Sequence, residues 1–197
     1  AGLMRLRDDT MAEAEITAQT ATDTLRSLNE LQQRFSGNTG SVGALNPLHD
    51  ERDRLLGQLA DTVGIAVDLD AVGRARVTLG SSGGGPELLG SAGPAVLTVS
   101  GETDLTLTIA RDGSSRDSRM IGSGKLGGFV TAIGAINSAL QEIDALARKM
   151  AGEMNAVHSA GLDLTGAPGG DMFSLDGWVM TRAAGNQGYA RAAVTPN

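Results

Sequence analysis

The chain has 197 residues, and its 16 Lys and Arg residues against 23 Asp and Glu residues give a formal net charge of −7. A chain this acidic repels phosphate backbones and anionic head groups, so we expect neither nucleic acid nor a membrane as its main partner. Cysteine is absent, which excludes disulfides, thiolate nucleophiles and cysteine-bound zinc.

The first predicted element is a long helix over residues 4–35, a stretch without Gly or Pro. Apolar residues recur there at heptad spacing, in steps of three and four that Arg7 and Gln32 interrupt: Met4, Met11, Ala14, Ala18, Ala21, Leu25, Leu28 and Phe35. A Gly- and Ser-rich connection follows at 36–43. Asn46 and Pro47 then mark the start of a second helix over 47–63, because Asn caps helices and Pro suits their first turn.

Beyond residue 64 the apolar period changes to two, which predicts antiparallel strands with one buried face. The alternating segments lie around Ile65 to Leu69, Val77 to Leu79, Val96 to Thr98 and Leu105 to Ile109. Gly-rich breaks separate them at 80–85, 90–94 and 112–114. Strands of this length predict a small sheet or sandwich.

The helical period returns over residues 126–157 in an unbroken alternation of three and four: Leu126, Phe129, Ile133, Ile136, Leu140, Ile143, Ala147, Met150, Met154 and Val157. We expect this helix to lie against the first long helix at about 20° in a bundle, with the helix over 47–63 covering part of the seam. Short strands are predicted again after Gly161, at 171–175, 178–182 and 189–194.

These elements predict an α+β chain that is elongated and built from two domains. The helical bundle domain comprises residues 1–64 and 122–161, and the β-rich antiparallel domain comprises residues 65–121 and 162–197. The chain would thus leave the bundle, enter the β-rich domain, return and leave again.

One glycine motif invites a nucleotide-binding interpretation, because residues 122–127 fit the pattern G-x-G-x-x-G before a helix. The context of that pattern is missing, since no parallel βαβ unit precedes it and the acidic residues Glu142 and Asp144 fall inside a helix. We interpret the motif as a strand-to-helix turn.

Imidazole and carboxylate groups do not form a convincing site either. His158, with Asn155 and Asp163 nearby, is interpreted as terminating the third helix, and His49 as a surface or capping residue. The carboxylate pairs Glu102 with Asp104 and Asp68 with Asp70 are typical of a solvated strand face, and residues 163–171 lack the acidic alternation of a calcium loop. We therefore predict no catalytic residues, no cofactor-binding residues and no metal ligands.

Three segments carry a resemblance to a known family. Residues 46–56 read NPLHDERDRLL and resemble N-x-L-L-D-Q-R-D-x-L-L, although His49 and Glu51 replace the usual Leu and Gln. Residues 123–129 read SGKLGGF and resemble S-G-x-L-G-G-L, and residues 155–173 read NAVHSAGLDLTGAPGGDMF and resemble N-x-x-H-x-x-G-x-D-L-x-G-x-x-G-G-D-F-F. In order and spacing these segments are similar to the flagellar hook-associated protein 1 family, the hook-filament junction proteins of bacteria.

The resemblance implies a structural component of the bacterial flagellum that joins hook to filament as a junction subunit and carries out no catalysis. Its implied partners are copies of itself in a ring, the hook protein and the next hook-associated protein, and its implied location is extracellular after secretion. The chain would be an interior piece without the terminal segments of the family, and we expect it to be monomeric in isolation. Export of unfolded flagellar subunits fits the absence of cysteine.

Two alternatives from other classes stay open on the sequence. A periplasmic adaptor also joins a helical hairpin to β modules, but there the hairpin is continuous, whereas here about 60 residues of β pattern separate the long helices. A glycan or peptide hydrolase would place its site in the β-rich domain, with Glu102 and Asp104 as the first residues to substitute.

Overall fold

The structure is a computed structural model that describes residues 2–37, 46–101, 104–119 and 121–174. Long helices and antiparallel sheets confirm the predicted α+β class. The chain divides into two compact units: Asp9–Gly134, and the described residues of Ala1–Asp8 and Ala135–Asn197.

All three predicted helices are present; α1 and α3 extend slightly beyond their apolar patterns, and α2 begins and ends one residue earlier than predicted. α1 spans Gly2–Gly37, α2 spans Asn46–Thr62 and α3 spans Gly124–Ala160. The extensions arise because the apolar pattern marks only the positions that can be buried, while a terminal turn needs no apolar residue. α2 begins at the predicted Asn46-Pro47 start signal.

The β region lies entirely within the first unit and forms two antiparallel sheets in chain order. The first sheet contains β1 (Ile65–Leu69), β2 (Ala75–Leu79), β3 (Glu87–Gly90) and β4 (Gly93–Pro94). The second sheet contains β5 (Val96–Ser100), β6 (Thr106–Arg111) and β7 (Ser114–Ser118). Within each sheet consecutive strands pair, so short turns suffice to connect them.

Three of these strands, β3, β4 and β7, were missed in the sequence because they carry no apolar alternation. β4 lies inside a segment that we interpreted as a Gly-rich break, and β7 consists of Ser, Arg and Asp only. β7 is held instead by its backbone ladder to β6, from Leu107↔Ser118 to Arg111↔Ser114, and by a 2.7 Å hydrogen bond from the Thr108 hydroxyl to Asp117. An edge strand needs no apolar face when its partner already supplies the buried residues.

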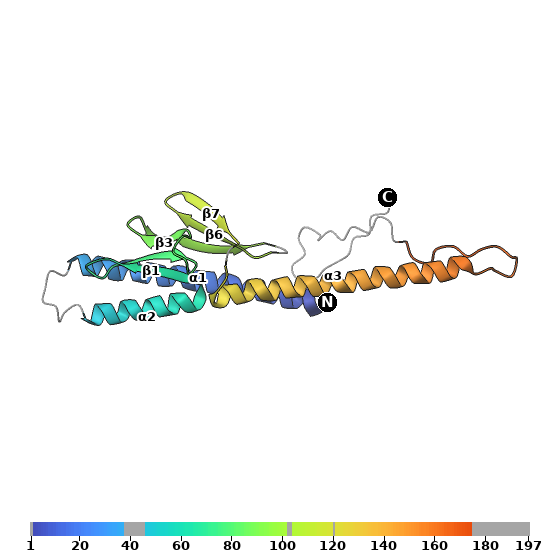
Figure 1. Cartoon of the computed structure of the whole chain (residues 1–197), viewed down its shortest axis with the longest axis horizontal. Helices are drawn as coiled ribbons and strands as arrows, with labels where there is room; N and C mark the ends of the chain where they lie inside the picture. The colour runs from blue at the N-terminus through green and yellow to red at the C-terminus, as the bar shows by residue number, and fades with distance from the viewer. Residues whose placement is uncertain (1, 38–45, 102–103, 120, 175–197) are drawn as a thin grey trace. The chain divides into compact units, whose positions relative to one another are not determined.

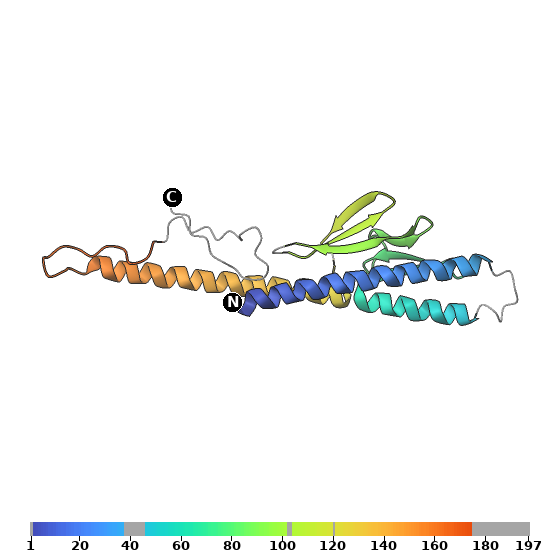
Figure 2. The ribbon, with the colours of Figure 1, turned by 180° about the vertical axis from the view of Figure 1, so that it is seen from behind.

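Within Asp9–Gly134, α2 runs beside α1 in the opposite direction, and both sheets lie on α1 (Figures 1 and 2). One hydrophobic core joins these elements and the first turns of α3. Its largest fully buried side chains come from all of them: Leu25, Leu28, Leu59, Val63, Val77, Leu88, Leu89, Leu107, Leu126 and Ile133. Burial of a Leu, Ile or Val side chain contributes about 1.5–3 kcal/mol, so this shared core is what holds sheets and helices together.

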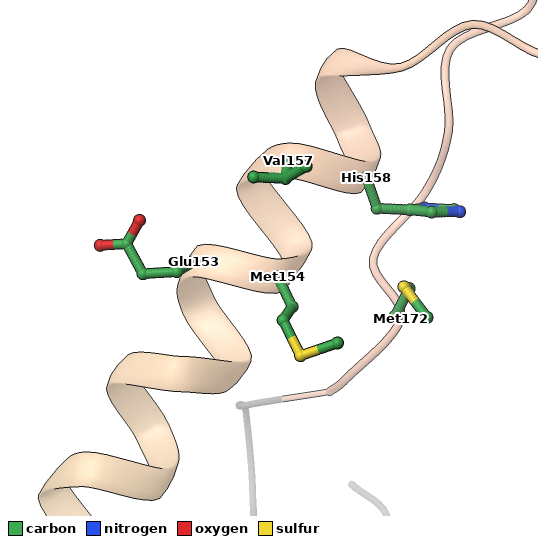
Figure 3. Close-up of a pocket in the computed structure, with 5 residues that line it drawn as sticks. All are labelled: Glu153, Met154, Val157, His158 and Met172. Atoms are coloured by element: carbon green, nitrogen blue, oxygen red, sulfur yellow. The ribbon is translucent and has the colours of Figure 1, made fainter.

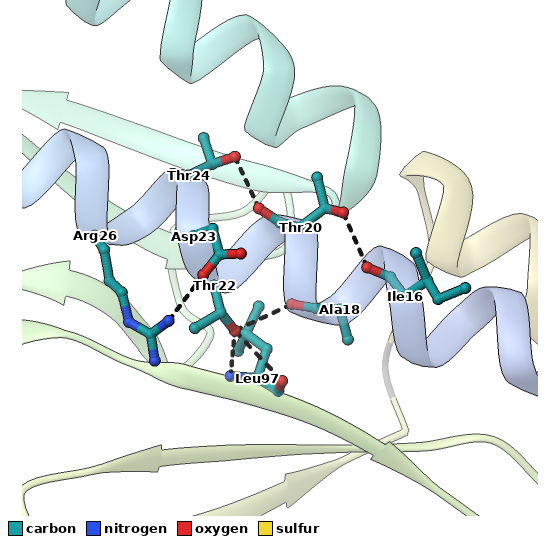
Figure 4. Close-up of polar contacts among 8 residues, drawn as sticks. All are labelled: Ile16, Ala18, Thr20, Thr22, Asp23, Thr24, Arg26 and Leu97. Carbon is teal, nitrogen blue, oxygen red and sulfur yellow. Dashed lines mark hydrogen bonds and ion pairs between the residues drawn. The ribbon is translucent and has the colours of Figure 1, made fainter.

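Buried polar side chains of α1 fix where each sheet docks. The Thr22 hydroxyl accepts a 2.9 Å hydrogen bond from the amide of Leu97 in β5 and lies 3.0 Å from the carbonyl oxygen of Ala18 (Figure 4). The Gln32 side-chain amide donates a 2.6 Å hydrogen bond to the carbonyl oxygen of Ala75 in β2. Both contacts bring strand backbone directly onto the helix, and each satisfies a backbone group that the core would otherwise leave unpaired.

Glu87 in β3 connects the two sheets. Its carboxylate accepts a 2.6 Å hydrogen bond from Arg76 in β2 and a 2.7 Å hydrogen bond from Arg111 in β6. The hydrogen bond from Arg76, supported by that from Arg111, holds the pKa of the Glu87 carboxyl below its usual value. The carboxylate thus acts as a charged bridge across the boundary between the sheets.

The segment after α3 does not form the strands predicted for it within the described residues. Residues 171–174 have no strand assignment, and the predicted strands at 178–182 and 189–194 lie outside the described residues. Residues 161–173 hydrogen-bond to the end of α3, as detailed below. The division into a bundle of 1–64 with 122–161 and a β-rich domain of 65–121 with 162–197 therefore stays a prediction.

Substituting Thr22 by Val should destabilise the unit by about 1–3 kcal/mol, because the shape is kept but the Leu97 amide loses its buried acceptor. Urea unfolding of the purified chain measures this free energy. Thr20→Val is the matched control: its exposed hydroxyl contacts only the Ile16 carbonyl of the same helix, so its change should stay below about 0.5 kcal/mol. Equal effects of the two substitutions would contradict the docking role.

Glu87→Gln should lower the free energy of unfolding at pH 7 by about 1 kcal/mol, since an amide cannot replace a carboxylate between two guanidinium groups. Because the folded-state pKa of Glu87 is lowered, its stabilisation is present above the ordinary carboxyl range and is lost as pH falls through the folded value. The difference from wild type should therefore shrink between pH 7 and pH 3 in urea titrations. Asp23→Asn, which removes the exposed pair with Arg26, is the control and should have little effect at either pH.

Candidate assembly surface

The glycine motif at residues 122–127 is a close contact between two helices. Gly124 has φ +73°, and a Cβ there would lie 2.8 Å from backbone atoms of Thr62 and Val63 at the end of α2. The Gly64 amide also donates a 3.2 Å hydrogen bond to the Ser123 carbonyl oxygen. The motif thus lies at the connection between β7 and α3, where Gly124 allows close approach to the end of α2.

Asn155 and His158 hold the chain that returns along α3. The Asn155 side chain makes a two-way pair with the backbone of Phe173: Nδ2 donates to the carbonyl oxygen at 2.6 Å, and Oδ1 accepts from the amide at 2.8 Å. The Nδ1 atom of His158 lies 2.6 Å from the carbonyl oxygen of Gly170. Gly169 is needed beside it, because a Cβ at Gly169 would overlap the His158 backbone. These contacts fix the direction of the segment after α3, and the His158 ring bonds that segment and not a terminal carbonyl of the helix.

Asp163 orders the tip of this return. Its Oδ1 atom accepts hydrogen bonds from the hydroxyl and amide of Thr165 and from the amide of Ala167, at 2.7, 2.8 and 2.9 Å. These donors, the Thr165 hydroxyl first, lower the pKa of the Asp163 carboxyl. Gly166, with φ +82°, completes the turn. All of these are local contacts, so Asp163 acts as a turn residue and not as a calcium ligand.

The apolar stripe of α3 has two different environments. Near the start of the helix Leu126 and Ile133 are 0% and 1% exposed and belong to the core of Asp9–Gly134. Further along, exposed side chains continue the same spacing: Ile143 at 55%, Met150 at 58%, Met154 at 45% and Val157 at 75%. Beyond Leu140 the same periodicity thus continues on side chains that are exposed. We call Ile143, Met150, Met154 and Val157 the α3 stripe.

The end of the α3 stripe borders a shallow apolar hollow between the helix and the returning segment. Figure 3 shows Met154 and Val157 on the helix and Met172 on the returning chain, with Glu153 and His158 completing the lining. Met172 is 55% exposed and Phe173 42% exposed, so apolar surface continues from the helix onto the return. Contiguous exposed apolar surface of this kind marks a site of interaction in soluble proteins.

The remaining candidate residues do not form a reactive site. Asp70 is paired with Arg74 at 2.7 Å and caps its turn, while Asp68 lies exposed on β1. Asp104 is exposed, and Glu102 lies outside the described residues. His49 is not a free surface residue, since its ring lies 5.0 Å from that of Phe35.

Two searches of the described residues found nothing further. Within ranges 2–37, 46–101, 104–119 and 121–174, there is no group of three or more His, Asp or Glu side chains placed to hold a metal ion. No helix in the described part of the chain is long and apolar enough to cross a membrane.

The family model for the flagellar hook-associated protein FlgK helical domain matches residues 1–173. The chain belongs to this family. Flagellar hook-associated protein 1 of Escherichia coli (strain K12) is 26% identical over 178 residues, which cover 87% of this chain and 32% of that protein. The protein of the same name from Salmonella typhimurium is 27% identical over 169 residues, covering 82% of this chain and 30% of that protein.

A solved structure, that of the flagellar hook junction protein FlgK from Burkholderia pseudomallei, has a similar fold with a TM-score of 0.72. The sequences are 22% identical, and the match covers 88% of this chain and 32% of that chain. The chain thus spans about a third of the length of these relatives. The FlgK family is a structural family of the flagellum and not an enzyme family, which excludes the hydrolase alternative.

The FlgK-like motifs seen in the sequence map onto backbone geometry, not onto a partner surface. Residues 123–129 pack the start of α3 against α2, and residues 155–173 form the return. The α3 stripe was missed as a surface because its periodicity is identical to that of the buried first turns. The sequence offered no signal to separate the two, since a period identifies an apolar face but not what covers it.

Asn155→Ala should release the return segment while leaving α3 helical, because it removes both hydrogen bonds to Phe173. We expect the Phe173 amide to exchange with solvent at least about tenfold faster, as measured by hydrogen exchange with NMR detection. Ser159→Ala is the control, since its exposed 3.3 Å contact with Asp171 contributes little. Unchanged protection of Phe173 in Asn155→Ala would show that other contacts hold the segment.

Proposed function

We propose that this chain is part of a junction subunit of the bacterial flagellum, a secreted structural protein that joins hook to filament outside the cell. Its partners in that role are copies of itself in a ring, the hook protein and the next hook-associated protein. Membership of the FlgK family supports the proposal, and two similar proteins are a flagellar hook-associated protein and a flagellar hook junction protein.

The observation that carries the proposal is the exposed α3 stripe. With Ala147 between Ile143 and Met150, its members follow the same three- and four-residue spacing as the buried first turns of α3. A stripe with this spacing fits another helix laid along it at a shallow angle, because knobs at every third and fourth residue fill the holes of a facing helix. An assembly subunit needs such a surface, whereas a protein that acts alone has no use for it.

The composition fits the same role. The net charge of −7 keeps an unassembled subunit soluble despite its exposed apolar stripe. The absence of cysteine prevents cross-links before assembly. Glu142 and Lys149 lie toward one side of the α3 stripe and Asp144 and Arg148 toward the other, and these charges can select the register of a partner helix.

Deletion of the parent gene should leave hooks without filaments, as seen by electron microscopy, and cells that do not swim. A full-length parent protein carrying Ile143→Asp with Met150→Asp should fail to restore swimming, because two charges would be buried in the assembled contact. Ala145→Asp with Ala156→Asp is the matched control: both residues are exposed and lie on the opposite face of α3, so swimming should be restored.

Measurements on the isolated chain separate assembly from folding. Ile143→Asp with Met150→Asp should change its free energy of unfolding by no more than about 0.5 kcal/mol per site, because both side chains are already exposed. Light scattering should report a monomer for wild type and variants alike. Filament assembly by the doubly substituted protein would refute the role of the α3 stripe, and a stable ring of the isolated chain would refute its monomeric state.

A further inference from the structure

His49 lies where three elements of the Asp9–Gly134 unit meet. It is in the first turns of α2, its ring contacts that of Phe35 near the end of α1, and it faces the turn between β1 and β2. At that turn Gly73 has φ +87°, and a Cβ on it would lie 2.5 Å from His49 Cε1. The ring and the turn are therefore in close contact, with no space for an additional group between them.

Arg52 contacts both His49 and the β1–β2 turn. It is 7% exposed, and its Nη1 atom lies 2.8 Å from the Gly73 carbonyl oxygen and 3.1 Å from His49 Nδ1. A guanidinium group can only donate hydrogen bonds. His49 Nδ1 must therefore accept, which requires a neutral ring with its proton on Nε2. The same arginine nitrogen thus bonds the imidazole and the turn at once.

His158 has the opposite arrangement. Its Nδ1 atom faces the Gly170 carbonyl oxygen at 2.6 Å, and a carbonyl oxygen can only accept. That nitrogen therefore carries a proton already, and a second proton on the ring would keep this hydrogen bond. The only two histidines in the sequence thus respond differently to acid: protonation preserves the contact of His158 and abolishes that of His49.

We propose that His49 and Arg52 form a proton-operated latch that docks the β1–β2 turn on α2. A proton on Nδ1 removes the acceptor for Arg52 and places two cations about 3 Å apart, as the heavy-atom distance of 3.1 Å indicates. Arg52 is too buried for water to screen that repulsion. Acid therefore releases the edge of the first sheet from the helices while the core behind it stays packed.

We assign the proposed pH response to His49 and not to the charged groups on the neighbouring elements. On α1 there is Arg34, on α2 there are Asp50 and Asp53 beside Arg52, and on the turn there are Asp70 and Arg74. Asp53 is paired with Arg52 at 2.7 Å and offsets part of the repulsion, but a carboxylate there does not restore the acceptor that a proton on Nδ1 removes. The hydrogen bond from Arg74 lowers the pKa of the Asp70 carboxyl, so Asp70 stays ionised over the range in which imidazoles titrate, about pH 5 to 8.

The test compares wild type with His49→Gln, whose side-chain oxygen can accept from Arg52 but does not titrate. Between pH 7.5 and pH 5 we expect wild type to lose the NMR contacts between the His49 ring and Gly73. We also expect its unfolding equilibrium to shift by about tenfold relative to His49→Gln, the effect of one hydrogen bond to a charged group. His158→Gln is the control and should keep the full pH response of wild type.

Parallel pH responses of wild type and His49→Gln would overturn the latch, as would contacts between His49 and Gly73 that persist at pH 5. The NMR measurement needs wild type alone, so the proposal stays testable if His49→Gln fails to fold. Loss of the pH response in His158→Gln instead would assign the effect to the return segment after α3.

Discussion

Burial of one face of α1 is the constraint on which the rest of the Asp9–Gly134 unit depends. The buried positions change from small to large along the helix, from Ala14, Ala18 and Ala21 to Leu25 and Leu28. Small side chains let strand backbone come close to the helix, and that is where Thr22 reaches the amide of Leu97. Larger side chains further along fill the space beneath the first sheet. Both sheets thus pack on one face of the same helix.

Backbone contacts, more than side-chain chemistry, explain the residues that stand out in the sequence. Gly124 allows α3 to start against the end of α2, and Gly169 allows the chain to turn beside His158. Asn155 pairs with backbone at both of its polar atoms. Each of these residues either allows two backbone segments to approach closely or pairs with a backbone group that would lack a partner. Gly, Asn and Asp commonly have these roles at helix ends and turns. A structural protein needs such residues as much as an enzyme does.

The two parts of α3 illustrate how one pattern can serve folding and assembly. Leu126 and Ile133 complete the core of their own chain, while Ile143 and Met150 carry the same pattern into solvent. Continuing one heptad stripe from a buried to an exposed stretch gives an assembling subunit a contact surface that is already helical and already ordered. Less conformational entropy is then lost when a partner helix binds.

The sequence by itself determined the helices and most strands, because these follow from local periods and from turn residues such as Asn46 and Pro47. Its three motifs carried the resemblance to the family. It did not predict β7, whose polar residues form a strand only because β6 offers a free edge. Nor did it show that Leu126 is buried while Val157 is exposed, or that His49 lies between Phe35 and Gly73. Only the tertiary structure decided these points, because burial and strand pairing depend on which distant segments of the chain pack together. The apolar period of a segment does not specify those neighbours.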